Sequence, residues 1–281
     1  MDDAFAAATE YAAKHQPHAL VIARDGQIET ESYAGGYEAA KPHALYSGTK
    51  SFWGIAAIAA ARDGLIDLDE PVANRLPEFA GDARRAITAR MLLSLTAGYG
   101  FGGLGVAVPT YERALELPLK DVPGTAFTYG GIQLQVFGAY FSRALASRGQ
   151  TPHAYLRAAI LAPAGVDFGA WRELKDGTQP LPTGAQLTAR AWLAYGRYVL
   201  ENLAQYRETV KGSAANPRYG LGWWLAPAGL PNDCFYASGA AGQGLYIVPS
   251  RAIVAVRFGK STSYKHDALL KRLVSPTSSA A

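Results

Sequence analysis

The sequence is poor in the residues that build disulfide and metal sites. Its one cysteine, Cys234, excludes an internal disulfide framework and a cysteine-based structural zinc site. Its five histidines show no His-Glu-x-x-His spacing, so a metal hydrolase has no visible ligands. We therefore expect neither a metal ion nor another cofactor.

Long apolar runs and signal-peptide features are also lacking. No uninterrupted stretch is long enough to span a bilayer, and the acidic N-terminus lacks the basic and apolar regions of a signal peptide. We expect a soluble chain with no membrane contact. It would be cytoplasmic as written, and periplasmic or secreted if a leader has been removed.

Charged residues are few as well, and neither sign is in large excess. Only 18% of residues are charged, and 27 basic against 23 acidic side chains give a net charge of +4. The basic residues are scattered along the chain, which argues against a nucleic-acid partner. The sequence carries no indication of an oligomeric state. What it does contain is 49% hydrophobic residues in 281, enough to bury the core of one large domain or of two interleaved lobes.

The pattern of apolar residues predicts strands at both ends of the chain and helices between them. An Asp25-Gly26 pair between two short apolar runs indicates a hairpin. The predicted strands are 19–23, 28–33, 220–226, 234–238, 245–248 and 253–258. A helix is predicted to follow Ser47, with Ser47 in its first turn, and to end at Asp63-Gly64. The other predicted helices are 2–15, 87–95, 133–147, 151–161, 187–203 and 265–274. We expect an α+β fold, in which both termini form one antiparallel sheet flanked by helices (1–62 and 213–281) and carry an inserted all-helical lobe (63–212).

Ser47 and Lys50 form the most informative pair of residues. They stand three apart where a loop becomes a helix, so they share one helix face. Unpaired N–H groups and the positive end of the helix dipole favour a developing oxyanion at Ser47. A lysine acts as a base near neutral pH only if its pKa falls several units below about 10.4, which burial among the neighbouring apolar residues would achieve. The alternative is a helix cap followed by a solvated lysine.

Two further segments carry candidate chemistry. Tyr129 lies on a loop at a helix entry, where a proton relay to the lysine could sit. Residues 236–244 form a strand that turns into small residues, which would allow its backbone to approach a substrate. A simple hairpin turn is the alternative for that segment.

The sequence resembles the serine β-lactamase and penicillin-binding-protein superfamily, in particular class C-like serine hydrolases such as family VIII carboxylesterases and nylon-oligomer hydrolases. Residues 47–52, Ser-Gly-Thr-Lys-Ser-Phe, match its Ser-x-x-Lys motif. Residues 64–72, Gly-Leu-Ile-Asp-Leu-Asp-Glu-Pro-Val, resemble the Gly-x-Leu-x-Leu-Asp-x-Pro-Val run that follows it. Residues 88–98 resemble the family's Leu-Leu-x-x-x-Ser-Gly segment.

The resemblance implies roles for individual residues. Ser47 would be the acylated nucleophile, Lys50 its base, and Tyr129 the proton relay to the leaving group. The N–H groups of Ser47 and Ala240 would form the oxyanion hole, since 237–240 fall where the third motif and the residue after it belong. The substrate would lie against Gly131, Ala237, Ser238 and Gly239. Apart from the resemblance, Tyr99 and Tyr111 are among the aromatic residues that could line an apolar acyl pocket; the alternative is that they pack in the core.

The sequence also departs from the family pattern. Gly131 replaces the asparagine of the usual Tyr-x-Asn, and Ala237 replaces the Lys or His that opens the third motif. In the lactamases these side chains help to hold the substrate's amide and carboxylate, so their loss argues against efficient β-lactam turnover.

Two other hydrolase and nucleotide-binding motifs are excluded. The glycine pattern at 98–103 follows a helix rather than a strand, which favours a loop at a cleft mouth over a dinucleotide site. No Gly-x-Ser-x-Gly elbow surrounds Ser47, which excludes an α/β-hydrolase.

We therefore predict a serine hydrolase that forms an acyl-enzyme and cleaves small carboxylic esters. One alternative is an amide or peptide hydrolase of the 6-aminohexanoate-oligomer or D-amino-acid type, with weak or no β-lactamase activity. Another is a non-catalytic binding domain on the same scaffold.

Overall fold

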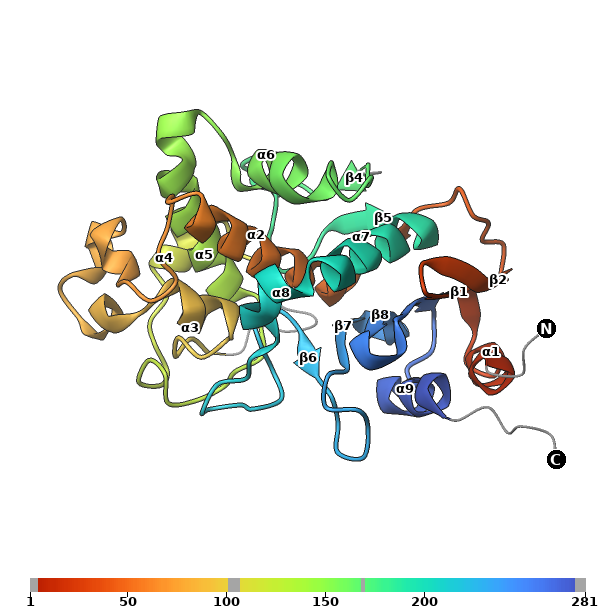
Figure 1. Cartoon of the computed structure of the whole chain (residues 1–281). Helices are drawn as coiled ribbons and strands as arrows, with labels where there is room; N and C mark the ends of the chain where they lie inside the picture. The colour runs from red at the N-terminus through yellow and green to blue at the C-terminus, as the bar shows by residue number, and fades with distance from the viewer. Residues whose placement is uncertain (1–4, 101–106, 168–169, 276–281) are drawn as a thin grey trace.

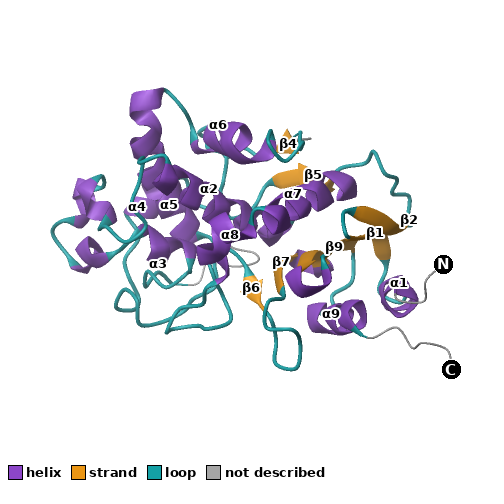
Figure 2. Cartoon of the chain, viewed as in Figure 1, coloured by secondary structure: helices purple, strands orange, loops and turns teal. Residues whose placement is uncertain are grey.

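The fold is organised around a six-stranded antiparallel sheet built from both ends of the chain (Figures 1 and 2). The structure is a computed structural model and describes residues 5–100, 107–167 and 170–275. The strand order is β2-β1-β9-β8-β7-β6. The strands are β1 (Pro17–Arg24), β2 (Gln27–Tyr33), β6 (Trp224–Leu225), β7 (Phe235–Gly239), β8 (Gln243–Val248) and β9 (Ile253–Gly259). The predicted α+β class is confirmed.

The sheet joins the two termini through the pairing of β1 with β9, in which Val21 faces Val256. The predicted hairpin is present, because β1 and β2 pair on either side of Asp25 and Gly26. Alternate side chains of a strand point to opposite faces of the sheet, and both faces are covered by a core. Leu245 and Ile247 of β8 belong to the main core, whereas Tyr246 belongs to a second core.

Helices cover the two faces unequally. Helices α1 (Ala6–Ala13) and α9 (His266–Val274) pack together over the second core, and α7 (Ala189–Glu201) packs on β1, β8 and β9 from the other side (Figure 1). The remaining α-helices are α2 (Ser51–Arg62), α3 (Ala89–Leu93), α4 (Tyr111–Leu115), α5 (Ile132–Leu145), α6 (Pro152–Leu156) and α8 (Leu203–Tyr206). Within the described residues no helix combines the length and apolar character needed to cross a bilayer.

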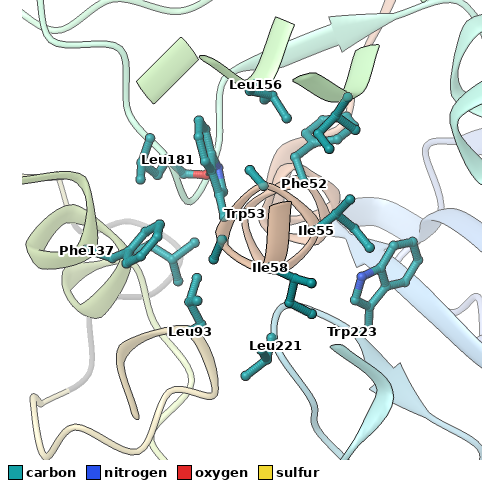
Figure 3. Packing of buried hydrophobic residues seen from close by; sticks show 14 of the residues in the cluster. Phe52, Trp53, Ile55, Ile58, Leu93, Phe137, Leu156, Leu181, Leu221 and Trp223 are labelled. Atoms are coloured by element: carbon teal, nitrogen blue, oxygen red, sulfur yellow. The ribbon is translucent and has the colours of Figure 1, made fainter. Parts of the chain in front are cut away.

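Helix α2 lies at the centre of the main core. Its first ten residues are all buried, so it is apolar on every side, as expected of a helix surrounded by protein. Viewed along its axis, Phe52, Trp53 and Ile55 point in different directions (Figure 3). They meet side chains from several other elements, among them Phe137 of α5 and Trp223 next to β6. This packing fixes the position of the turn that precedes α2.

The middle of the chain differs from the prediction in three places. The helix predicted at 87–95 spans only Ala89–Leu93, because Leu95 adopts a positive φ of 60° that turns the chain out of the helix. The helix predicted at 151–161 changes from α6 to a π-helical turn at Arg157–Leu161. The region 63–212 is not all helical: β4 (Ala170–Trp171) and β5 (Ala185–Leu187) form a small sheet with β3 (His43–Ala44).

The small sheet has a consequence for the chain around it. It joins residues 170–187 to β3, which lies just before Ser47. Helix α7 also falls within 63–212 but packs on the main sheet. The division into lobes at residues 62 and 213 stays a prediction.

Candidate active site

Ser47 lies in a short 3-10 turn, Tyr46–Lys50, that runs directly into α2. We expected Ser47 in the first turn of an α-helix, and the tighter turn brings Ser47 and Lys50 onto one side. Tyr46 has a positive φ of 48° and remains 43% exposed, while Ser47 is partly exposed. A non-glycine residue in this backbone region costs on the order of 1–3 kcal/mol, a strain that is often found at functional sites.

Lys50 is the buried cationic group of the site. Its side chain is only 3% exposed, and its Nζ lies 2.8 Å from Ser47 Oγ and 3.2 Å from the carbonyl oxygen of Pro182. Burial lowers the pKa of Lys50 to about 7. A neutral amine has two N–H groups and one lone pair, so an N–H can donate to Pro182 while the lone pair accepts the hydroxyl proton of Ser47.

The Pro182 carbonyl is held by a dense set of hydrogen bonds along residues 179–182. Four consecutive carbonyl oxygens each accept a bond from a different side chain, and the peptide N–H of Leu181 donates to Gln135. The donors are Tyr111 to Gln179 (2.9 Å), Trp171 to Pro180 (2.9 Å), Trp53 to Leu181 (2.6 Å) and Lys50 to Pro182 (3.2 Å). Sequence reasoning missed this segment, because a backbone carbonyl 132 positions from Lys50 leaves no signal in the side-chain pattern.

Tyr129 lies over the lysine. Its ring centroid is 4.8 Å from Lys50 Nζ, and its hydroxyl interacts with the side chains of Ser47 and Trp224. Burial raises the pKa of Tyr129 above the ordinary phenol value, and the hydrogen bonds with Ser47 and Trp224 only partly oppose this rise. The phenol therefore stays protonated at neutral pH, and Lys50 is the stronger candidate for the base.

The Tyr129 loop is anchored on both sides. The Thr128 N–H donates to the Leu95 carbonyl (3.0 Å), and Gln133 Nε2 donates to the Thr128 carbonyl (2.9 Å). Beside Tyr129, the Trp224 ring lies 5.4 Å away and is partly exposed. The loop thus leads into an aromatic wall around Trp224 that also includes Phe127 and Tyr219.

The end of β7 reaches the Ser47 turn by a close backbone approach. A Cβ atom on Gly239 would stand 2.1 Å from the carbonyl oxygen of Leu45, so only glycine fits there. Ala240, which follows, is partly exposed, whereas Ala237 is only 1% exposed and packs in the main core. Ser238 Oγ is bonded to His266 Nε2 at 2.9 Å.

Gly131 is the cap residue before α5 and is buried. It has no side chain that could reach Lys50. The second hydrogen-bond partner of Lys50 is instead the Pro182 carbonyl. Among the described parts of the chain, no three or more His, Cys, Asp or Glu side chains come together as a metal site.

Tyr99 and Tyr111, which could line a pocket or fill the core, both make packing contacts. Tyr99 has no exposed surface and packs in the core, so its ring does not line an open cleft. Tyr111 is partly exposed, but its hydroxyl is bonded to Gln179 and its ring packs on Gly138 of α5. Both rings pack within the protein, as most tyrosines do. Residues 101–103 of the predicted loop at 98–103 lie outside the described residues.

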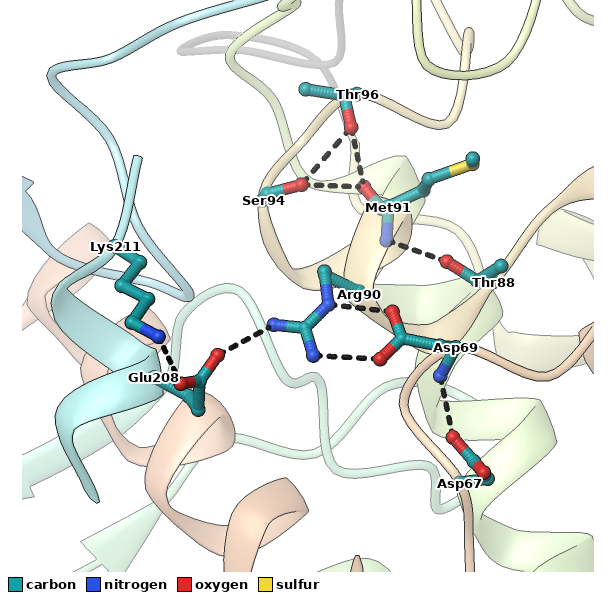
Figure 4. Close-up of polar contacts among 9 residues, drawn as sticks. All are labelled: Asp67, Asp69, Thr88, Arg90, Met91, Ser94, Thr96, Glu208 and Lys211. Atoms are coloured by element: carbon teal, nitrogen blue, oxygen red, sulfur yellow. Dashed lines mark hydrogen bonds and ion pairs between the residues drawn. The ribbon is translucent and has the colours of Figure 1, made fainter. Parts of the chain in front are cut away.

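Residues 64–72 and 88–98, the two segments that resemble the family after Ser47, meet at Arg90 (Figure 4). Arg90 forms a two-pronged ion pair with Asp69 (2.6 and 2.8 Å) and a longer one with Glu208 (3.4 Å). Within the second segment, the Thr88 hydroxyl caps α3 by accepting the Met91 N–H at 3.2 Å. These segments therefore support the Tyr129 loop through Leu95 rather than contributing reactive groups.

A comparison with protein-family models matches residues 6–275 to the family described as Beta-lactamase. The chain belongs to the beta-lactamase family. This beta-lactamase-fold family comprises serine hydrolases, so the coarse prediction of a hydrolase holds.

The chain is also similar to a curated protein over part of its length and to solved structures that share its fold. A 143-residue match at 32% identity relates the chain to acyltransferase calJ of Penicillium decumbens, over 36% of this chain and only 34% of that protein. A Bacillus anthracis protein provisionally assigned as a 6-aminohexanoate-dimer hydrolase superposes with a TM-score of 0.78 at 18% identity, over 92% of this chain and 77% of its own. A hydrolase with promiscuous acyltransferase activity, EstCE1, superposes with a TM-score of 0.75 at 16% identity, over 96% of this chain and 97% of its own.

Proposed function

We propose that this protein is a serine esterase that forms an acyl-enzyme at Ser47. The observation that carries the proposal is the 2.8 Å contact between Ser47 Oγ and Lys50 Nζ, in which the lysine is buried and its pKa is lowered to about 7. A nucleophile with an adjacent base that can be neutral at physiological pH is the minimal unit for acyl transfer.

The reaction proceeds in two balanced steps. Ser47 Oγ attacks the ester carbonyl carbon, and the hydroxyl proton of Ser47 moves to Lys50 Nζ. The carbonyl oxygen becomes an oxyanion that accepts hydrogen bonds from the N–H groups of Ser47 and Ala240. The C–O bond to the leaving alcohol then breaks as Tyr129 donates its proton to the alkoxide and regains one from Lys50. In the second step water attacks the acyl carbon and gives a proton to Lys50 Nζ. The bond to Ser47 Oγ then breaks as Ser47 regains a proton, and the acid is released.

The groups around this pair favour small esters over lactams. Gly131 and the buried Ala237 offer no side chain to hold a substrate's amide or carboxylate. The partly exposed rings of Phe127 and Trp224, backed by the buried Tyr219, form an apolar surface that suits an uncharged acyl or alcohol group. Hydrolysis of 6-aminohexanoate oligomers or D-amino-acid peptides is the competing specificity, and both use the same acyl-enzyme.

Labelling of Ser47 tests the acyl-enzyme directly. Wild-type protein treated with a fluorophosphonate should gain one adduct, and peptide mass spectrometry should place it on Ser47 because only this serine contacts a buried lysine among the described residues. Ser51, which lies beside it and is buried, should stay unmodified and serves as an internal control. Absence of the adduct would favour a non-catalytic binding domain.

A substrate panel tests the specificity. We expect p-nitrophenyl butyrate to be hydrolysed with a higher kcat/KM than nitrocefin, the 6-aminohexanoate dimer or D-Ala peptides. A higher kcat/KM on either of the last two would replace the esterase proposal with amide hydrolysis. Adding an alcohol and separating ester from acid products would show whether the acyl group is also transferred, as the acyltransferase relative suggests.

The rate of ester hydrolysis should depend on the protonation of Lys50. The lowered pKa of about 7 means that the amine is charged and inactive below that pH and neutral above it. The kcat/KM for an ester should therefore rise tenfold per pH unit on the acid side and level off above about pH 7.5. Tyr129 should add no falling limb below about pH 10, since its pKa is raised. A flat profile between about pH 5 and 8 would contradict Lys50 as the base.

A further inference from the structure

The turn after β7 has an unusual arrangement of fixed carbonyl groups. Residues 240–242 form a 3-10 turn in which Ala241 has a positive φ of 59°. The Ala240 carbonyl accepts a bond from Gln243 Nε2 (2.7 Å). The Ala241 and Gly242 carbonyls both accept bonds from Arg257 Nη1 (3.1 and 2.8 Å). The carbonyl groups of residues 240–242 are thus all fixed by hydrogen bonds, next to the Ala240 N–H that we assign to the oxyanion hole.

Arg257 is a buried cation that lacks a carboxylate partner. It lies in β9 with no exposed surface, and among the described residues it forms no ion pair. Its guanidinium instead donates to the carbonyls of 241 and 242 and to that of His15, and lies 4.2 Å from the centre of the Tyr264 ring. Removing an unpaired charge from water is costly, so packing alone does not account for an arginine at this position.

The space for the guanidinium is provided by glycine. A Cβ atom on Gly242, which has a φ of +84°, would stand 2.4 Å from Arg257 Nη1. The field of Arg257 extends beyond these contacts. It lowers the pKa values of His43 and His266 after the larger effect of burial, and that of His18 after the larger effects of burial and of His43. Arg257 therefore contributes positive potential behind the turn.

A second set of hydrogen bonds holds the other end of the turn. Ser238 Oγ is 2.9 Å from His266 Nε2, and His266 Nδ1 is 2.7 Å from the hydroxyl of Tyr246. The Tyr246 hydroxyl is in turn 2.8 Å from that of Tyr264, whose ring lies under Arg257. Both ends of 238–242 are thus connected to one polar network, on the face of the sheet covered by α1 and α9 and opposite to α2.

We propose that Arg257 and the hydrogen-bonded chain of His266, Tyr246 and Tyr264 are positioning residues of the oxyanion hole. They hold the 238–242 segment so that the Ala240 N–H meets the substrate's carbonyl oxygen, and the charge of Arg257 adds to the potential that stabilises the oxyanion. This inference rests on the proposed acyl-enzyme chemistry at Ser47. None of these residues contacts the reacting atoms, so they act through the backbone of the turn.

Substitution of Arg257 separates this role from a structural one. Arg257→Met removes the charge and the bonds to the turn, and should lower kcat by roughly 10- to 100-fold with little change in KM, because oxyanion contacts form mainly in the transition state. The Tm should fall moderately, because the carbonyls of Ala241, Gly242 and His15 lose their donor and removal of the buried charge offsets only part of that loss, so the role is decided by the split between kcat and KM. Arg257→Lys keeps the charge but not the two-pronged geometry, and should restore part of kcat. Arg143→Lys, which alters an arginine paired with Glu78 far along α5, is the matched control and should leave kcat unchanged.

Tyr246→Phe tests the second branch, and it also decides the question if Arg257→Met does not fold. The ring remains, but the bonds from its hydroxyl to His266 and Tyr264 are lost. We expect a several-fold loss of kcat and of affinity for an alkyl boronic acid, which mimics the tetrahedral oxyanion, and no loss of affinity for a ground-state amide analogue. Tyr155→Phe removes a hydroxyl bonded to Asp63 in the helical region and should change neither affinity.

The outcomes distinguish the two proposals. If wild-type protein is neither labelled at Ser47 nor active on esters, the proposed function fails and this inference fails with it. If wild type is labelled and active but Arg257→Met and Tyr246→Phe keep kcat and boronic-acid affinity within about twofold of wild type, only the positioning role is overturned. Equal losses of kcat and ground-state affinity in both variants would also overturn it, because they indicate general disruption.

Discussion

Replacing Ser47 with alanine should lower kcat for p-nitrophenyl butyrate by roughly 10⁴- to 10⁶-fold, since loss of a covalent nucleophile removes the whole acyl-enzyme route. The remaining activity would come from the oxyanion hole and from substrate binding. Ser47 is partly exposed, and its hydroxyl contacts Lys50 and Tyr129, so the change leaves no large cavity. We therefore expect the Tm to change by no more than a few degrees, and fluorophosphonate labelling to disappear.

A partly exposed serine with no contact to Lys50 provides the control. Ser142 lies in α5, and its hydroxyl donates to the Gly138 carbonyl at 2.8 Å. Ser142→Ala should therefore retain wild-type kcat and full labelling. Activity of Ser47→Ala within tenfold of wild type, measured after excluding contaminating esterase with a separately purified preparation, would eliminate the assignment of Ser47 as nucleophile.

The sequence predicted those parts of the fold and site that depend on neighbouring residues. Ser47 and Lys50 are three positions apart, so any helical turn brings them together, and the apolar residues of α2 identify it as a buried helix. The Asp25-Gly26 hairpin is likewise a local feature. In each case the chain distance is short and the local preference agrees with the final structure.

The parts that could not be predicted depend on contacts between distant residues. Pro182 approaches Lys50 across 132 positions, and His266 approaches Ser238 across 28. The sequence could not decide whether Tyr99 lines a pocket or fills the core, because an aromatic ring suits both environments, and the structure buries it. Arg257 lies within the predicted strand 253–258. Its contacts with backbone carbonyls have no counterpart in a side-chain pattern.

Substitution of Lys50 by methionine should abolish esterase activity and stabilise the protein at the same time. Methionine has nearly the shape of the lysine stem but no base, so kcat should fall by several orders of magnitude, as it does when one member of a catalytic unit is lost. The increase in stability follows from the pKa. A folded-state pKa of about 7 against the ordinary 10.5 corresponds to a penalty of about 5 kcal/mol for holding the charged amine in the folded state.

The penalty has a defined pH dependence. Below about pH 7 both the folded and the unfolded protein carry the proton, so wild type bears the full cost. Between about pH 7 and 10.5 only the unfolded state binds the proton, so wild-type stability rises with pH through this window and the cost disappears. Methionine cannot titrate. The stability advantage of Lys50→Met should therefore be largest at about pH 6 and decrease towards pH 9.

Urea unfolding of wild type and Lys50→Met at about pH 6 and pH 9 would measure this advantage. Losing the bond to the buried Pro182 carbonyl costs about 1–3 kcal/mol, so the net gain expected at pH 6 is roughly 2–4 kcal/mol. Lys14→Met, which alters an exposed lysine paired with Glu10, is the control and should change the free energy of unfolding by less than about 0.5 kcal/mol at both pH values. If Lys50→Met is no more stable than wild type at pH 6, the folded protein does not disfavour the charged form of Lys50. The proposed neutral base would then lose its physical basis.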